Sequence, residues 1–355
     1  MDLPPVAPHR DWAWTTPDRD PVAIAFVGLG GFTTDWVLPS AAAADGVTVG
    51  AVVSGSAEKA TRVAGEYDAT ALSYQAYADG EARDRYDAVY VATPNATHLD
   101  HVETAARHGK AVLCEKPVET TADRARRLRD ACADADVVLQ VAYRLQVDPV
   151  VRWARAVIDN GGLGTPVHAQ ATMSQDLFTA IGPTTDQWRL DPDLAGGCAL
   201  IDLGIYPLNT LRFLTGQDPI RVQATTQSPD PRFDGVDQDA ALTLSFADGL
   251  VAAVTASQLS ARGDHLHLVG TDAELVLDPA FFGEVTATVV GPEDSRSVSI
   301  DTNEMRRQLE YFAAHVQTGE RPEPDGDHAL VDAATIDAAY ESAATGDAIE
   351  VDPPD

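Results

Sequence analysis

The stretch Val22-Ala-Ile-Ala-Phe-Val27, followed by Gly28-Leu-Gly-Gly-Phe-Thr33, decides the fold of this chain. The first six residues form a continuous apolar run, which is typical of a strand buried on both faces of a parallel sheet. The glycines then predict a tight turn into a helix over about residues 34–44. A glycine-rich turn between a buried strand and a helix is the context of a dinucleotide site, because Gly28 permits the turn and Gly30 lets the backbone approach a pyrophosphate.

Thr33 stands where the full fingerprint has its last glycine, which loosens the match. The alternative is an ordinary glycine-rich turn, and the flanking strand and helix argue against it. We expect the turn to contact a dinucleotide through Gly28, Leu29, Gly30, Gly31 and Phe32.

Strands and helices alternate from this turn to about residue 145, which predicts a doubly wound parallel sheet. Further strands are expected over residues 47–53, 87–92, 111–115 and 137–142. Helices are expected over residues 57–67 and 121–133, and another helix, through Val102, is expected between the strands 87–92 and 111–115.

Beyond residue 145 the pattern changes to alternating segments with fewer helices, which predicts an α+β domain with mostly antiparallel strands. The expected division is an arm over residues 1–20, a Rossmann domain over 21–145 and a second domain over 146–355, whose helix 327–345 packs back toward the first. Strands are expected over 167–174, 221–226, 240–246, 250–257, 265–270 and 274–277, and helices over 148–160, 200–214, 303–317 and 327–344.

The net charge of −30 is extreme for 355 residues. Of 25 basic residues only three are lysines (Lys59, Lys110 and Lys116), so 22 are arginines. Concentrated salt screens such a surface within a Debye length of about 3 Å, which predicts a salt-adapted, cytoplasmic protein. The same field disfavours nucleic acid and anionic membranes as partners, because phosphate binding needs cationic patches.

The three cysteines, Cys114, Cys132 and Cys198, form no CxxC pair and suit a reducing compartment. Residues 1–20 are rich in proline and lack the features of a secretory signal. No run approaches the ~18 uninterrupted apolar residues of a membrane span. His265 and His267 alternate along a predicted strand but lack a third ligand nearby, so no metal site is expected.

The end of the second strand indicates which nucleotide is bound. NAD enzymes usually place an acidic residue there for the ribose 2′-hydroxyl. This chain has Ser54-Gly55-Ser56 and then Lys59, two hydroxyls and a lysine at a helix start. We therefore expect a 2′-phosphate pocket and NADP as the cofactor; pairing of Lys59 with a surface carboxylate is the alternative.

A catalytic group is predicted from two further motifs. Lys116, in Glu115-Lys116-Pro117, ends a strand at the carboxyl edge of the sheet, where open α/β folds bind their ligands. Asp202 and Tyr206 are four apart and share one face of a predicted helix. A phenol beside an ammonium titrates lower and can serve as a base. Taken alone, such an Asp/Tyr pair is usually a helix cap and a core tyrosine.

Together these motifs resemble the Gfo/Idh/MocA family of oxidoreductases, in the expected order from about residue 21 to 351. Tyr206 stands where inositol dehydrogenase-like members carry His. The segments 143–144, 186–189 and 204–209 resemble those of the NADP-dependent D-xylose 1-dehydrogenases of halophilic archaea. The motifs that carry the likeness are Gly28–Thr33, Thr93-Pro94-Asn95 with His98, Glu115-Lys116-Pro117 and Asp202-x-x-x-Tyr206.

This resemblance implies hydride transfer from C1 of a cyclic aldose, giving a lactone. Tyr206 would be the acid/base and Lys116 would lower its pKa, while Asp202 and Asn209 would position the sugar. It also implies a large open sheet in the second domain, commonly used for dimer or tetramer contacts. The residues implied to line the cofactor groove, or to lie near the nicotinamide or sugar, are Thr93, Pro94, Asn95, His98, Glu115, Arg144, Trp188 and Arg189.

Two other functions remain open at this point. One is a sugar oxidoreductase of the glucose–fructose oxidoreductase or dihydrodiol dehydrogenase kind with bound NADP. The other is a non-catalytic, nucleotide-sensing regulator on the same fold, which would not need Lys116 and Tyr206 together. Trp12 and Trp14 in the arm predict either an anchor on the protein body or a contact with a partner subunit.

Overall fold

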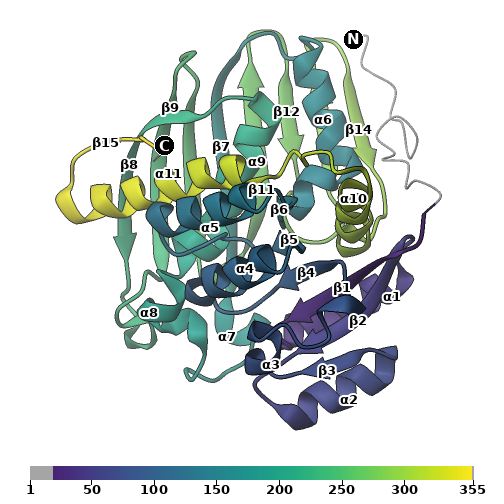
Figure 1. Cartoon of the computed structure of the whole chain (residues 1–355). Helices are drawn as coiled ribbons and strands as arrows, with labels where there is room; N and C mark the ends of the chain where they lie inside the picture. The colour runs from purple at the N-terminus through teal and green to yellow at the C-terminus, as the bar shows by residue number, and fades with distance from the viewer. Residues whose placement is uncertain (1–18, 354–355) are drawn as a thin grey trace.

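The computed structural model describes residues 19–353, so Trp12, Trp14 and most of the arm lie outside the described residues. Six parallel strands form the first sheet in the order β3-β2-β1-β4-β5-β6, which confirms the doubly wound arrangement (Figure 1). The strands are β1 Val22–Val27, β2 Val47–Val53, β3 Thr70–Leu72, β4 Ala88–Val91, β5 Ala111–Cys114 and β6 Leu139–Val141.

Helices cover both faces of this sheet. On one face α4 and α5 pack against the strands, and on the other lie α1, α2 and a late helix, α10, whose Leu309 and Phe312 share a cluster with Ile24 and Phe26. A helix from the second half of the sequence therefore completes the core of the first sheet. The helices are α1 Leu38–Ala43, α2 Ala57–Tyr67, α3 Tyr74–Ala78, α4 His98–Arg107, α5 Ala122–Asp134 and α10 Glu304–Thr318.

The second sheet has nine strands in the order β14-β13-β12-β11-β7-β10-β9-β8-β15. Its pairs are antiparallel except for β10 with β7, which confirms the predicted mostly antiparallel sheet. The strands are β7 Pro166–Asp176, β8 Pro219–Gln227, β9 Asp239–Phe246, β10 Val251–Ser257, β11 Leu259–Gly270, β12 Glu274–Leu277, β13 Thr286–Val290, β14 Ser295–Ser299 and β15 Ile349–Glu350.

Four of the strands, β3, β13, β14 and β15, were not predicted. They lie at or next to the sheet edges, where a strand needs little apolar surface. In β14, for example, Val298 is the one apolar residue among three serines and an arginine. Pairing with a neighbouring strand determines these segments more than their own pattern does.

One face of the second sheet is covered by helices, and its other face is turned away from them (Figure 1). Helix α11 packs between β8 and α5, the latter a helix of the first sheet. Asp337 of α11 accepts a hydrogen bond from the Ala122 amide at the start of α5, at 2.8 Å. The helices here are α6 Pro149–Asp159, α7 Leu177–Ala180, α8 Pro192–Ala195, α9 Ile205–Thr215 and α11 Gly326–Thr345.

The predicted helices over 34–44 and 200–214 are each less regular than expected. Each opens with a wide π-helical turn, Thr33–Val37 before α1 and Ala199–Gly204 before α9. Such turns are common at functional sites. Here the first follows the glycine turn and the second carries Asp202. The helical stretch Pro192–Thr215 is long and apolar enough to span a membrane by composition, but 78% of its most apolar window is buried in the protein. It is therefore placed as a core helix.

Candidate active site

The glycine turn after β1 has the shape that a dinucleotide requires. Gly28 has φ +98°, and a Cβ there would lie 2.4 Å from the Ala92 carbonyl oxygen, so glycine is needed at this position. A Cβ at Gly30 would meet no atom within 4 Å, which leaves open space where a pyrophosphate approaches the helix start. The residues present therefore fit the cofactor.

The predicted 2′-phosphate pocket lies at the neighbouring strand end. Ser54 is buried and its hydroxyl accepts from the Ser56 amide at 3.2 Å, while the Ser56 hydroxyl accepts from the Lys59 amide and caps α2. The Lys59 ammonium donates to the Leu29 carbonyl at 3.1 Å. Lys59 thus bridges the two loops that would hold the nucleotide, and the structure gives it a carbonyl partner where the alternative predicted a carboxylate.

Sequence reasoning missed an aromatic group at this edge. The ring of Tyr74, 37% exposed, lies 3.4 Å from the position of a Cβ on Gly55 and stacks on His101 with the ring centroids 5.2 Å apart. Burial lowers the pKa of His101 to about 4, so this ring is uncharged at neutral pH. An exposed ring directly after β3 had no signal in the sequence, because β3 itself was not predicted.

Lys116 and Asp202 form the centre of the candidate catalytic group. The Lys116 ammonium donates to the Asp202 backbone carbonyl at 2.9 Å and to its carboxylate at 3.1 Å, and both side chains are about nine-tenths buried. Pro207, five residues after Asp202, has no N–H to offer the preceding turn. The π-helical turn thus presents both a carboxylate and a carbonyl to one ammonium.

Tyr206 lies beside two cations. The Lys116 nitrogen is 4.5 Å from the centre of its ring and the Arg144 guanidinium carbon is 5.1 Å from it. Arg144 is itself held by an ion pair with Glu304 at the start of α10 and by the Phe281 carbonyl. The predicted convergence of Lys116, Asp202 and Tyr206 is present in the structure, and Arg144 joins them.

The charges of this group are mutually dependent. Burial raises the pKa of the Tyr206 phenol, but Lys116 and Arg144 lower it more, so the pKa lies below its ordinary value of 10.0. Burial likewise raises the pKa of Asp202, and Lys116 and Arg189 hold it well below its usual range. Burial lowers the pKa of Lys116, which Tyr206, Asp202 and Glu115 more than offset. At neutral pH the site therefore holds an ammonium, a carboxylate and a readily ionised phenol.

Two further groups bind the Asp202 carboxylate. Arg189 donates to Oδ2 at 3.1 Å, with its guanidinium 4.5 Å above the Trp188 ring, and Gln258 donates to the same oxygen at 2.9 Å. Arg189 and Trp188 were predicted near the nicotinamide or sugar, and here Arg189 joins the catalytic group. Gln258 was not predicted, because nothing in its local pattern distinguishes it.

Asn95 and His98 are turned into the protein. The Asn95 amide donates to the Ala195 carbonyl at 2.9 Å, and the His98 ring lies between the carbonyls of Thr93 and Pro117 at 2.9 and 3.1 Å. Both residues are almost fully buried, so their atoms are occupied in holding the loops around the site. The cofactor contacts expected of Thr93, Pro94, Asn95 and His98 stay a prediction.

Glu115 and Asn209 have partners within the protein too. Glu115 accepts from the Tyr90 hydroxyl at 2.5 Å. The Asn209 carbonyl accepts from Gln146, and its amide donates to Asp332 at 2.7 Å. This network holds the part of α9 that follows Tyr206. Asn209 also lines a small pocket with Lys116 and Tyr206, and its expected contact with the sugar stays a prediction.

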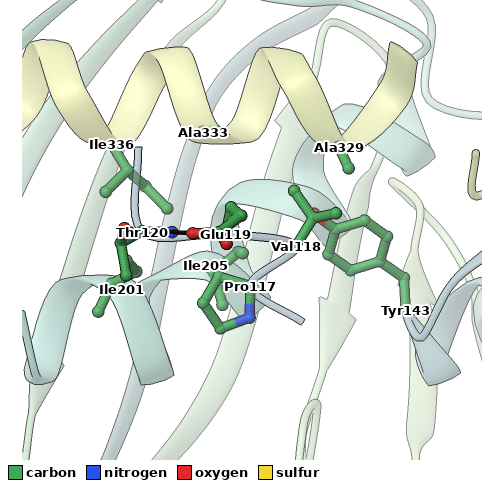
Figure 2. Close-up of a pocket in the computed structure, with 10 residues that line it drawn as sticks. All are labelled: Pro117, Val118, Glu119, Thr120, Tyr143, Ile201, Ile205, Ala329, Ala333 and Ile336. Carbon is green, nitrogen blue, oxygen red and sulfur yellow. Dashed lines mark hydrogen bonds between the residues drawn. The ribbon is translucent and has the colours of Figure 1, made fainter. Parts of the chain in front are cut away.

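A small pocket, lined mostly by apolar side chains, lies next to this group, under α11 (Figure 2). Ala329, Ala333 and Ile336 of α11 face the segment Pro117–Thr120, with Ile201 and Ile205 on the opposite side. Its volume of about 10 Å³ is too small for a sugar or nucleotide. It is a packing gap that separates the segment following Lys116 from the late helix.

A parallel doubly wound sheet with this glycine turn, and a Lys/Tyr pair at its carboxyl edge, define a nucleotide-dependent oxidoreductase. The chain belongs to the Gfo/Idh/MocA family: residues 22–143 match the oxidoreductase family model with an NAD-binding Rossmann fold, and 151–276 match the Gfo/Idh/MocA C-terminal domain. This confirms the resemblance seen in the sequence.

Several proteins of known activity are similar to the chain over nearly their whole length. It is 40% identical over 350 residues, 97% of both chains, to D-xylose 1-dehydrogenase [NADP(+)] of Haloarcula marismortui. It is 34% identical to D-xylose 1-dehydrogenase (NADP(+)) 2 of Haloferax volcanii, covering 92% of this chain and 98% of that one. A solved aldose–aldose oxidoreductase of Caulobacter crescentus, complexed with glycerol, superposes with a TM-score of 0.87 at 29% identity, covering 93% and 99% of the two chains.

Proposed function

We propose that this enzyme oxidises a cyclic aldose, D-xylose by preference, at C1 to the lactone with NADP⁺ as acceptor. The single observation that carries the proposal is the position of Lys116, bonded to Asp202 and 4.5 Å from the ring of Tyr206 at the carboxyl edge of the Rossmann sheet. The identity to two NADP-dependent D-xylose dehydrogenases supports the choice of sugar and nucleotide.

In this reaction Tyr206, as phenolate, accepts the proton of the C1 hydroxyl. Lys116 and Arg144 favour the phenolate, and Asp202 keeps the Lys116 ammonium in place. NADP⁺, when bound, would accept the hydride from C1. The glycine turn, with Ser54, Ser56 and Lys59, would hold this nucleotide. The aldose thus loses a hydride and a proton and becomes a lactone, without any metal ion in the scheme.

The test is NADP⁺ reduction by the purified protein in concentrated salt with xylose, glucose, arabinose and myo-inositol. We expect D-xylose to give the highest kcat/KM, and the product to be a lactone. Discrimination between pentose and hexose is expected to be modest, about 10- to 200-fold, because the sugars differ by one CH₂OH. Absence of NADPH formation with every aldose would overturn the proposal.

The alternatives give other results in the same preparation. A sugar–sugar oxidoreductase would retain NADP(H) through purification, visible in its absorbance, and would not release it after each turnover. A non-catalytic regulator would bind nucleotide without reducing it. The buried Lys116–Asp202 pair beside Tyr206 favours the dehydrogenase over the regulator.

A homo-oligomer formed through the uncovered face of the second sheet is a further part of the proposal. In a chain with 55 acidic residues, the outward positions of the central strands β10 and β9 include the small, uncharged Ala253, Thr255, Ala241 and Thr243. On β7 the same face carries His168, Gln170 and Thr172. A surface with so few charges in so acidic a chain suits contact with a second copy of itself.

Introducing charge on this face is expected to separate the subunits. The double variant Ala253→Glu/Thr243→Glu should shift the mass from a dimer or tetramer to a monomer in light scattering, because apposed carboxylates repel in a self-complementary interface. Thr61→Glu, an exposed change on α2, is the control and should leave the mass unchanged. A monomeric parent protein, or an unchanged mass in the double variant, would contradict the proposed interface.

We also propose a cytoplasmic location in a salt-rich cell. The net charge of −30 and the three free, buried cysteines support it, since the former tolerates high salt and the latter suit a reducing compartment.

A further inference from the structure

Gln258 is a fully buried glutamine whose side chain is held in one orientation against the Asp202 carboxylate. It stands between β10 and β11 and is 0% exposed. Its side-chain nitrogen donates to Asp202 Oδ2 at 2.9 Å, and its side-chain oxygen accepts from Gln175 at 3.0 Å. Rotation of the amide would break both hydrogen bonds, so its orientation is set.

The backbone of Gln258 is also held on both sides. Its amide donates to the Gln238 carbonyl at 2.9 Å, and its carbonyl accepts from the Leu177 amide at the start of α7 at 2.8 Å. Each polar atom of Gln258 thus has a hydrogen-bond partner, as burial requires. Here the side-chain donor is directed at a carboxylate of the candidate catalytic group.

This support determines where the Lys116 ammonium stands. An ammonium has three N–H groups, and Lys116 directs two of them to the carbonyl and Oδ1 of Asp202. The third is left for the side on which Tyr206 lies. Because Gln258 and Arg189 hold the other carboxylate oxygen, Asp202 cannot turn without moving Lys116 away from the phenol.

The neutrality of Gln258 matters as well. The carboxylate of Asp202 faces two cations, Lys116 and Arg189, so this part of the site carries an excess of positive charge that favours an anion at Tyr206. A neutral donor preserves this balance, whereas a further cation or carboxylate at residue 258 would change it.

We propose that Gln258 is a positioning residue of the dehydrogenase reaction, acting through Asp202 on the place of Lys116 beside Tyr206. This inference rests on the proposed function. The charged and titratable groups that face Tyr206 from the surrounding elements are Lys116, Asp202, Arg144, Glu115 and Tyr90.

The test is Gln258→Met, which keeps the volume and removes both polar atoms. We expect kcat to fall about tenfold, since one hydrogen bond to a charged group is lost. The acid limb of the pH profile of kcat/KM should move up by about one unit, because a displaced ammonium favours the phenolate less. Gln175→Met, which removes only the partner of the Gln258 oxygen, should give a smaller shift in the same direction.

Gln238→Met is the matched control, because Gln238 is another buried glutamine of the same sheet, and its side chain bonds Asp239 and the Asp230 amide. It should lower thermal stability without moving the pH profile. An unchanged profile in Gln258→Met, whatever its stability, would overturn the proposal.

A second readout separates this inference from the proposed function. Titration of tyrosine labelled with ¹³C at Cζ, with Tyr206 identified by its absence in Tyr206→Phe, reports the phenol without any turnover. Its midpoint should rise in Gln258→Met and stay in Gln238→Met. If the parent protein oxidises no aldose yet this midpoint moves, the proposed reaction fails and the support of Lys116 by Gln258 stands; if it does not move, the positioning role fails by itself.

Discussion

Replacing Tyr206 by phenylalanine is expected to lower kcat by about 10³-fold while NADPH binding is retained. The change removes one oxygen from a ring that packs against Phe281 and lies beside Lys116 and Arg144. The apolar part of the side chain is kept, so the fold and the nucleotide site, which lies at the glycine turn, should be unaffected. Steady-state rates and a fluorescence titration with NADPH measure the two quantities.

The pH dependence provides a second check on the same variant. Because the pKa of Tyr206 is lowered from 10.0, the phenolate is present above that lowered pKa and lost as the pH falls through it. The parent kcat/KM should therefore rise with pH and level off below pH 10, whereas the residual activity of Tyr206→Phe should lack this limb. Tyr86→Phe is the control, because Tyr86 is another buried tyrosine beside a lysine, Lys110, and this change should leave the limb in place. Full activity in Tyr206→Phe would refute its assignment as the base.

Five of the six strands of the first sheet, all except β3, could be predicted because local chemistry determines them. The buried run Val22–Val27 and the glycines after it specify one local structure, and a lysine-poor composition draws attention to the few lysines. The structure explains all three: Lys59 bonds Leu29, Lys110 bonds the Tyr86 carbonyl, and Lys116 bonds Asp202. Two of them lie at the candidate site, and Lys110 supports the fold.

The support of the site could not be predicted, because it depends on contacts between distant segments. Gln258 meets Asp202 across 56 positions, and Asp237 accepts from the amides of Cys198 and Leu200 at 2.7 Å, fixing the start of the turn that carries Asp202. Neither residue stands out in its own strand or loop. The register of β9 and β10 brings both to the site, and a single sequence does not specify register.

The same reason explains why the partners of Asn95, His98 and Asn209 within the protein were not predicted. They lie on the loop and helix elements expected from their position along the chain, and their contacts with cofactor and sugar stay predictions. The direction of each side chain depends on partners in other elements, such as Ala195 and Asp332. The sequence motifs thus predicted where the site lies, but they did not predict the partners of each side chain within it.

Ser54→Asp is expected to weaken NADP⁺ far more than NAD⁺. At 4 Å a pair of unit charges repels by about 1 kcal/mol in water and about 4 kcal/mol near a protein surface, so a carboxylate facing the 2′-phosphate should raise the KM for NADP⁺ about 100-fold. The new carboxylate would also pair with Lys59 and withdraw its charge from the phosphate. For NAD⁺ the same carboxylate can accept from the ribose 2′-hydroxyl, so its KM should fall or stay within about threefold.

The local backbone tolerates this change, which makes the result interpretable. The Ser54 oxygen accepts from the Ser56 amide, and an aspartate can accept from the same amide in the same turn. Ser54→Ala is the control: it removes the hydroxyl without adding charge and should affect NADP⁺ only about tenfold. The ratio of kcat/KM for the two nucleotides in each variant is the measurement. Equal losses for NADP⁺ and NAD⁺ in Ser54→Asp would mean that the 2′-phosphate lies elsewhere, because repulsion at this strand end acts only on the nucleotide that carries the phosphate.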